Sequence, residues 1–125
     1  LVATRKKQNV RRSIAASVHK VQRAGLFVIA GFIVGFDTEK GSISDEMIAC
    51  IEEAAIPVCM VGMLTALANT QLQARLARES RLFPPEWQAE RFGRAGGDQC
   101  TLGLNFETRR SRREVLNDYR QVIEK

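Results

Sequence analysis

The ten residues Ala30 to Glu39 (AGFIVGFDTE) decide the fold of this chain. They begin as a run of apolar side chains and end on two carboxylates, Asp37 and Glu39. The apolar run starts at Leu26, and residues 26–36 are apolar on both faces, as in the strands of parallel sheets that are covered by helices. The segment is therefore either a buried strand that ends in a turn, or a strand whose carboxyl end holds a cofactor.

Length and composition indicate one folded domain. The chain has 125 residues, of which 45% are apolar and 26% are charged, so it can bury a core and is not expected to be disordered. No apolar run reaches the roughly 18 residues of a membrane helix, and the start does not resemble a signal peptide. We therefore expect no transmembrane segment.

The net charge of +5 comes largely from two basic clusters, within residues 5–12 and 109–113. Neither cluster is interleaved with aromatic residues, and no nucleic-acid-binding motif is present. We interpret both clusters as solvated surface and expect no nucleic-acid partner.

The cysteines do not form a recognisable framework. Cys50, Cys59 and Cys100 lie far apart, which is typical of buried thiols in a reducing cytoplasm rather than of disulfides or a zinc site. The single histidine, His19, is interpreted as a surface residue, so no metal site is expected in this chain.

Hydrophobic periodicity and capping signals predict the order α-β-α-β-α-β-α. Gly25 ends the first helix, Ser42 or Ser44 caps the second, Thr70 caps the third, and Ser111 with Glu114 forms a capping box for the last. The expected elements are a helix over 9–24, strands over 26–36, 58–67 and 100–106, helices after Ser42 or Ser44, Thr70 and Ser111, and an irregular loop over 83–99 with one helical turn around Trp87.

The fold class that this order predicts is α/β with three parallel strands. Three parallel strands leave two long apolar edges, and the chain opens on a helix at Leu1, so we expect the C-terminal part of a larger α/β enzyme. The unpaired first or third strand would then promote self-association. The alternative is a self-contained small α/β binding module whose basic surface meets an acidic partner.

Polar residues follow each predicted strand, and ligands of parallel α/β proteins bind at these carboxyl ends. An acid–base pair of Asp37 and Glu39 is one interpretation, but loop hydrogen bonding is favoured. An anion beside Arg109 to Arg113 is another, although arginines that extend into water are favoured. The strand-end residues are Asp37, Thr38, Glu39, Thr65, Asn69, Asn105, Glu107 and Thr108.

Several of these segments resemble one family. GFIVGFDTE, from Gly31 to Glu39, resembles the Gly-x-Ile-x-Gly-x-x-Glu strand of radical S-adenosylmethionine (SAM) enzymes. LANTQL, over 67–72, is similar to the Leu-Pro-Gly-Thr-x-Leu of cobalamin-binding radical enzymes, with Ala68 and Asn69 in place of Pro-Gly. Gln8-Asn9 and LGLNF, over 102–106, resemble the branch that includes the hopanoid methylases.

The resemblance implies a fold and a division of the chain. Residues 1–82 would form the C-terminal half of a partial (β/α) TIM-like barrel, and residues 26–36 would be its fifth strand. Residues 83–99 would form a loop, and residues 100–125 the last strand and helix of a C-terminal extension.

The resemblance also implies a cofactor site. Ile33 would contact the adenine of SAM, Gly31 and Gly35 would allow close approach, and Met63 and Leu64 would line the adenine side through their backbone. Glu39 would fix the loop.

The implied parent enzyme is a cobalamin-dependent methyltransferase with a [4Fe–4S] cluster held by Cys-x3-Cys-x2-Cys. That motif is absent from this sequence, so the chain is expected to need the rest of the parent and to be inert alone, with no catalytic residue and no tightly bound cofactor.

Overall fold

The computed structural model describes residues 13–92 and 103–125, and its architecture is mixed α/β. Two strands pair in parallel in one sheet, with Ile29 opposite Val58 and Val34 opposite Met63 at the two ends of the register. The predicted parallel pairing of the first two strands is therefore confirmed. The elements are α1 (Ile14–Arg23), β1 (Ile29–Val34), α2 (Ser44–Glu53), β2 (Val58–Met63), α3 (Gln71–Arg78), α4 (Pro85–Phe92) and α6 (Arg112–Ile123).

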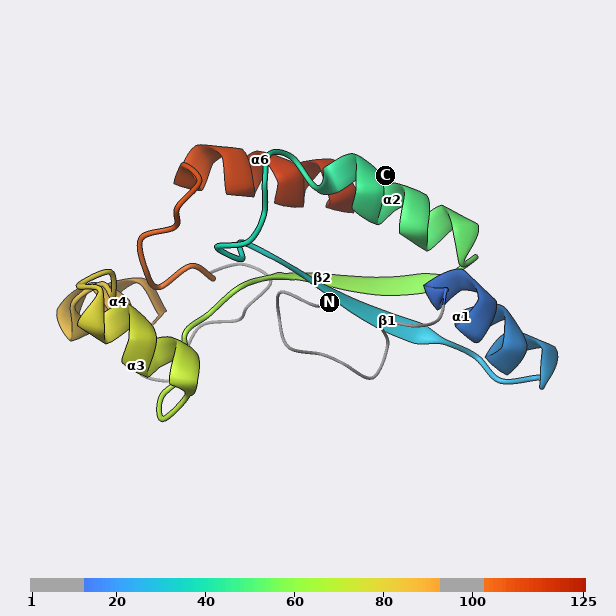
Figure 1. The fold of residues 1–125 in the computed structure, drawn as a ribbon, viewed down its shortest axis with the longest axis horizontal. Coiled ribbons are helices and arrows are strands. Elements are labelled where there is room, and N and C mark those ends of the chain that lie inside the picture. Colours follow the sequence, from blue (N-terminus) through green and yellow to red (C-terminus); the bar gives the residue numbers. More distant parts are fainter. Residues whose placement is uncertain (1–12, 93–102) are drawn as a thin grey trace.

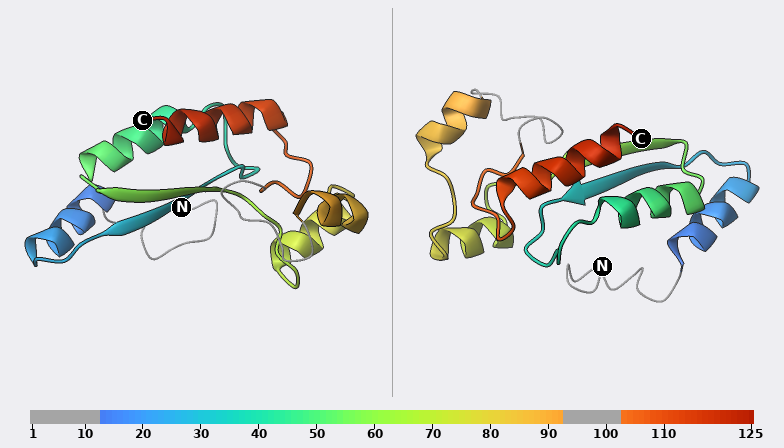
Figure 2. Two further views of the ribbon diagram at one scale, coloured as in Figure 1. Left: turned by 180° about the vertical axis from the view of Figure 1, so that it is seen from behind. Right: turned by 90° about the horizontal axis from the view of Figure 1, so that it is seen from above.

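The helices α1, α2 and α6 lie on one side of the two strands, while α3 and α4 lie beyond the carboxyl end of β2 (Figures 1 and 2). The main core forms where α6 and α2 pack on the sheet, and a smaller cluster joins α1 to the start of β2. The buried side chains of the main core are Val34, Val61, Met63, Ala66, Leu76, Leu104, Phe106, Val115 and Val122.

One face of the sheet packs against these helices and the other does not. Side chains alternate between the faces of a strand. Phe32 and Val34 of β1 therefore pack in the core, whereas Ile33 between them is 42% exposed. The expectation that helices cover both faces is wrong for the described residues. The physical reason is that α2, which connects β1 to β2, lies on the same side as α1 and α6.

The prediction of a third strand over 100–106 is wrong for residues 103–106, the part that the structure describes. Residues 103–106 form no strand, because Leu104 adopts a left-handed conformation with φ of 63° that interrupts an extended ladder. The segment still follows the end of the sheet, since Leu104 N donates to Leu64 O at 2.8 Å. Phe106 forms an isolated antiparallel bridge with Leu82. Residues 100–102 lie outside the described residues, and the third βα unit of a barrel is not confirmed.

The interval expected as an irregular loop contains a helix of eight residues, α4, which begins at Pro85. Proline suits the first turn of a helix because it needs no hydrogen-bond donor there. The rings of Phe83 and Trp87 lie 4.3 Å apart between centroids, and the Arg112 guanidinium lies 5.9 Å from the Trp87 ring. The second of these contacts joins α4 to the start of α6. Residues 93–99 lie outside the described part of the chain.

Three of the four predicted caps are confirmed. The Thr70 hydroxyl accepts from Gln73 N at the start of α3, Ser111 and Glu114 form the capping box of α6, and Gly25 ends α1 with φ of 80°. The cap predicted for α2 is wrong. Its N-cap residue is Ile43, because the hydroxyls of Ser42 and Ser44 bond to side chains of α6.

None of the helices in the described residues is long and apolar enough to span a membrane.

Candidate functional site

The exposed face of the sheet is apolar and open. Ile29 and Ile33 of β1 and Met60 of β2 are 59%, 42% and 60% exposed. Gly31 lies between the two isoleucines and opposite Met60, and a Cβ atom at this position would meet no atom within 4 Å. Backbone and apolar side chains together therefore form a surface on which a flat ligand can lie.

The structure brings together two of the five predicted cofactor-binding residues, Gly31 and Ile33. Gly35 has φ of 101° and packs differently, since a Cβ atom there would lie 2.7 Å from Cδ2 of Leu104. The Met63 side chain is 3% exposed and belongs to the helix-covered core. Gly35 and Met63 therefore have clear roles in packing.

Leu64, the fifth predicted residue, contributes to the fold through its backbone hydrogen bonds. Its N–H donates to Val34 O, and its carbonyl accepts from Leu104 N, both at 2.8 Å. Leu64 thus extends the pairing of β1 with β2 by one residue and links the sheet to residues 103–106.

Glu39 holds the end of β1. Its Oε1 atom accepts hydrogen bonds from Gly35 N and Phe36 N, both at 2.8 Å. The side chain therefore closes the turn that follows Val34, and the predicted use of Glu39 in loop hydrogen bonding is confirmed.

A buried charge network ties this turn to the helices. Asp118 of α6 is 2% exposed, and its carboxylate accepts from Arg110 Nη1 at 2.7 Å, Ser42 Oγ at 2.7 Å and Ile43 N at 3.3 Å. Arg110 Nη1 also lies 3.4 Å from Glu39 Oε2. Burial alone would raise the pKa of Asp118, but the hydrogen bonds from Arg110, Ser42 and Ile43 outweigh it and hold that pKa below its ordinary value.

A second charge cluster surrounds Asp37, three residues after β1. Arg81 donates two hydrogen bonds to its carboxylate, at 2.6 and 2.9 Å, and Arg75 Nη2 lies 2.8 Å from Oδ2. Arg109 Nε lies 3.9 Å from the same oxygen. The hydrogen bonds from Arg81 hold the pKa of Asp37 below its usual range.

The interpretation of residues 109–113 as solvated surface is therefore wrong for two of the arginines. Arg110 pairs with buried Asp118, and Arg112 Nη1 donates to Leu104 O at 2.8 Å. Both guanidiniums supply hydrogen bonds that the buried groups need, which outweighs their hydration. The other basic cluster, in residues 5–12, lies outside the described residues.

The remaining strand-end residues do not converge on one site. Asn105 is buried, and its amide pairs with both backbone groups of Ala66, at 2.8 and 3.1 Å. Asn69 has φ of 62° in the turn before α3, as expected for an asparagine in place of glycine. The Thr108 hydroxyl donates to Arg110 O at 2.7 Å. These groups shape loops.

The sequence reasoning missed Asp118 and Arg81 as the centres of charge networks. One signal was available for Asp118, because it lies three residues after Val115 and four before Val122, on the buried stripe of α6. A carboxylate at such a position needs a partner. No comparable signal marked Arg81, since its partner Asp37 lies 44 residues away.

The two cysteines in the described residues, Cys50 and Cys59, are free thiols. Burial raises the pKa of the Cys59 thiol, which disfavours the thiolate that ligates metals. Within residues 13–92 and 103–125, no group of three His, Cys, Asp or Glu side chains is placed to hold a metal ion. Cys100 lies outside this part.

Known proteins resemble the chain over most of its length. It is 41% identical, over 93% of its residues, to an uncharacterized methyltransferase of Synechocystis sp. (strain ATCC 27184 / PCC 6803 / Kazusa). Over 66% of its residues it is 34% identical to the hopanoid C-2 methylase of Rhodopseudomonas palustris (strain TIE-1). The chain spans only 20% and 16% of the lengths of these two relatives.

Residues 70–125 match a family model described as a domain of unknown function (DUF4070). No solved structure matches the chain. The matches confirm the resemblance of the chain to the radical SAM enzymes. The second relative confirms the resemblance to the branch that includes the hopanoid methylases.

Proposed function

We propose that this chain is part of a cobalamin-dependent radical SAM methyltransferase that acts on an unactivated carbon atom. The relatives support the methyl transfer, because both carry methyltransferase or methylase names. The observation that carries the chain's own role is the exposed apolar face of β1 around Ile33. On this proposal, that face forms the adenine wall and part of the substrate cavity.

The residues of this face fit an adenine ring. Adenine is flat, and it binds well to an apolar surface that leaves backbone groups within reach. Ile33 offers its side chain at 42% exposure, and Gly31 leaves the backbone open beside it. When bound at a reduced cluster, SAM supplies the radical that activates the substrate. The chain itself orients the adenine and excludes water from it, and Glu39 keeps the end of β1 in place.

The residues described here do not fit an iron–sulfur cluster. A cluster with one open iron needs three thiolates. Cys50 and Cys59 are the cysteines that the described residues supply, and the raised pKa of Cys59 disfavours its thiolate. We therefore propose that the cluster ligands belong to another part of the parent protein, and that this chain alone is inactive.

The open edge of the sheet supports the expectation that this region associates with another polypeptide segment. β1 pairs with β2 along one edge, and in the described residues its other edge has no partner strand. We propose that the remainder of the parent protein covers this edge. Light scattering on the isolated chain should therefore detect self-association, and a monomer at high concentration would favour the alternative of a self-contained binding module.

The function can be tested with the full-length parent, reconstituted anaerobically with iron and sulfide. Iron content and release of 5′-deoxyadenosine from SAM are measured for the wild type and for Ile33→Asp. The matched control is Leu116→Asp, which adds the same charge at a similarly exposed apolar residue of α6, away from this face. We expect iron loading in all three proteins, and we expect release of 5′-deoxyadenosine to fall at least about tenfold only in Ile33→Asp. The reason is that bound adenine would bury the new carboxylate without a partner. Absence of iron and of release in the wild type would refute the function.

A further inference from the structure

Three guanidinium groups from separate segments converge on one carboxylate, that of Asp37. Arg75 lies on α3, Arg81 follows that helix, and Arg109 precedes α6. Their nearest nitrogens lie 2.8, 2.6 and 3.9 Å from the Asp37 oxygens. The Asp37 side chain is only 9% exposed, so it is enclosed by these cations.

Arg81 is fully used within the fold. It makes two hydrogen bonds to Asp37, one to Glu79 Oε2 at 2.8 Å and one through Nε to Glu107 O at 2.8 Å. Its side chain is 13% exposed. Arg81 therefore anchors the cluster and has little capacity left for a ligand.

Arg75 and Arg109 differ from Arg81 because they keep accessible donors. Their side chains are 41% and 65% exposed. Arg75 has one close contact, with Asp37, and a marginal one of 4.0 Å with Glu79. Among the described residues, the ion-pair contact of Arg109 is the one of 3.9 Å from its Nε atom, so its terminal nitrogens remain available.

The charges of the cluster do not balance. Three guanidinium groups meet two carboxylates, Asp37 and Glu79, and this leaves a positive excess. The shared carboxylate of Asp37 holds Arg75 and Arg109 near each other despite their repulsion. A guanidinium presents parallel N–H groups that match the two oxygens of a carboxylate or a phosphate.

The cluster also lies where ligands bind in parallel sheets. Asp37 follows β1 by three residues, and α3 lies beyond the carboxyl end of β2 (Figure 1). We propose that Arg75 and Arg109 bind an oxyanion, the carboxylate or phosphate group of a ligand, at this edge of the sheet. This site rests on the geometry of the arginines and does not depend on radical chemistry.

The site can be tested by calorimetry on the full-length protein with two monoanionic probes, acetate and dimethyl phosphate, at constant ionic strength. We expect one of them to bind, and its affinity to fall about tenfold in Arg75→Gln and in Arg109→Gln. Acetate binding would identify a carboxylate ligand, and dimethyl phosphate binding a phosphate ester. The matched controls are Arg78→Gln, on the same helix as Arg75, and Arg113→Gln, near Arg109; neither should change the affinity.

The substitution of exposed Arg109 is the decisive one, because Arg75→Gln also removes a partner of Asp37. A second substitution at the same position, Arg109→Lys, keeps the charge and removes the planar fork, so it should retain part of the affinity. The proposal is overturned if neither probe binds to the wild type, or if all five variants bind a probe equally well.

Discussion

The two faces of the β1–β2 sheet use neighbouring residues for different purposes. Val34 is fully buried beneath the helices, and Ile33, the residue before it, is 42% exposed on the opposite face. Both are β-branched and apolar, so composition does not distinguish them. What differs is the partner, because the described helices supply one layer of packing and leave the other face open. The covered face stabilises the fold, and the exposed face is available for binding.

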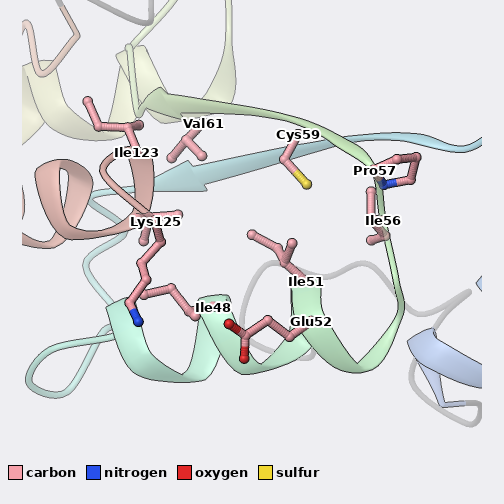
Figure 3. A pocket seen from close by; sticks show the side chains of 10 residues that line it. Ile48, Ile51, Glu52, Ile56, Pro57, Cys59, Val61, Ile123 and Lys125 are labelled. Carbon is pink, nitrogen blue, oxygen red and sulfur yellow. The ribbon is translucent and has the colours of Figure 1, made fainter.

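The covered side also contains a pocket. It has a volume of about 310 Å³ and lies between β2, α2 and the end of α6 (Figure 3). Its walls are mostly aliphatic, with Cys59 at the sheet and the charged ends of Glu52 and Lys125 at the helices. The pocket lies on the opposite side of the sheet from Ile33, so it plays no part in the proposed adenine site.

The largest effect on the covered side is expected for Asp118→Ala. This change removes the carboxylate that binds Arg110, Ser42 and Ile43, and it leaves the partly buried Arg110 with only its longer contact to Glu39. We expect a loss of about 3 kcal/mol or more in the free energy of unfolding. Urea denaturation measures it, and a loss below about 1 kcal/mol would contradict a central role for this network.

Asp118 also predicts how stability depends on pH. Its pKa in the folded protein lies below the ordinary value of 3.8, so the ionised form is favoured by folding. The stabilisation is complete above that ordinary value and is lost as the pH falls through the lower, folded value. Urea denaturation from about pH 6 to about pH 2 should show this loss, with a shallower slope in Asp118→Asn. Equal slopes in both proteins would refute the assignment.

A pair of glycines provides the next comparison of the two sides. A Cβ atom at Gly103 would lie 2.8 Å from the Met63 carbonyl oxygen, whereas one at Gly31 meets nothing within 4 Å. Gly103→Ala should therefore cost about 3 kcal/mol, because backbone has to move, and Gly31→Ala should change stability by less than about 0.5 kcal/mol. Thermal denaturation of both variants checks this difference. Similar melting temperatures would mean that the two environments are not distinct.

The smallest effect is expected for truncation of adjacent side chains. Val34→Ala removes two methyl groups from the core and should cost about 2 kcal/mol. Ile33→Ala removes a larger group from the exposed face and should cost under about 1 kcal/mol. If urea denaturation gave the larger loss for Ile33→Ala, the assignment of the two faces would be reversed.

The sequence predicted those features that depend on neighbouring residues. Ser111 and Glu114 are three residues apart, and the Thr70 hydroxyl bonds to Gln73 N, so local spacing was sufficient for both caps. The apolar segments around Ile33 and Val61 likewise predicted β1 and β2. Parallel pairing followed from the helix between them.

The features that the sequence did not predict depend on distant contacts. The Ser42 hydroxyl donates its hydrogen bond to Asp118, 76 residues away, and for that reason does not cap α2. Leu104 lies within residues 100–106, which the sequence predicted to be a strand, yet its left-handed backbone allows the Asn105 amide to bond to Ala66. In these cases the folded arrangement of the chain determines which hydrogen-bond partner each side chain has.

The substitution Gly31→Val is the sharpest test of the proposal that the exposed face of β1 binds SAM. Open space at Gly31 means that the valine should leave the fold intact, while its side chain occupies the surface proposed for adenine. The measurement is the dissociation constant of SAM for the cluster-loaded, full-length protein, with Leu116→Phe on α6 as the control for added bulk outside this face. We expect affinity at least about tenfold weaker in Gly31→Val alone, a loss of roughly 1.4 kcal/mol. Unchanged affinity in a correctly folded, cluster-loaded Gly31→Val protein would contradict it.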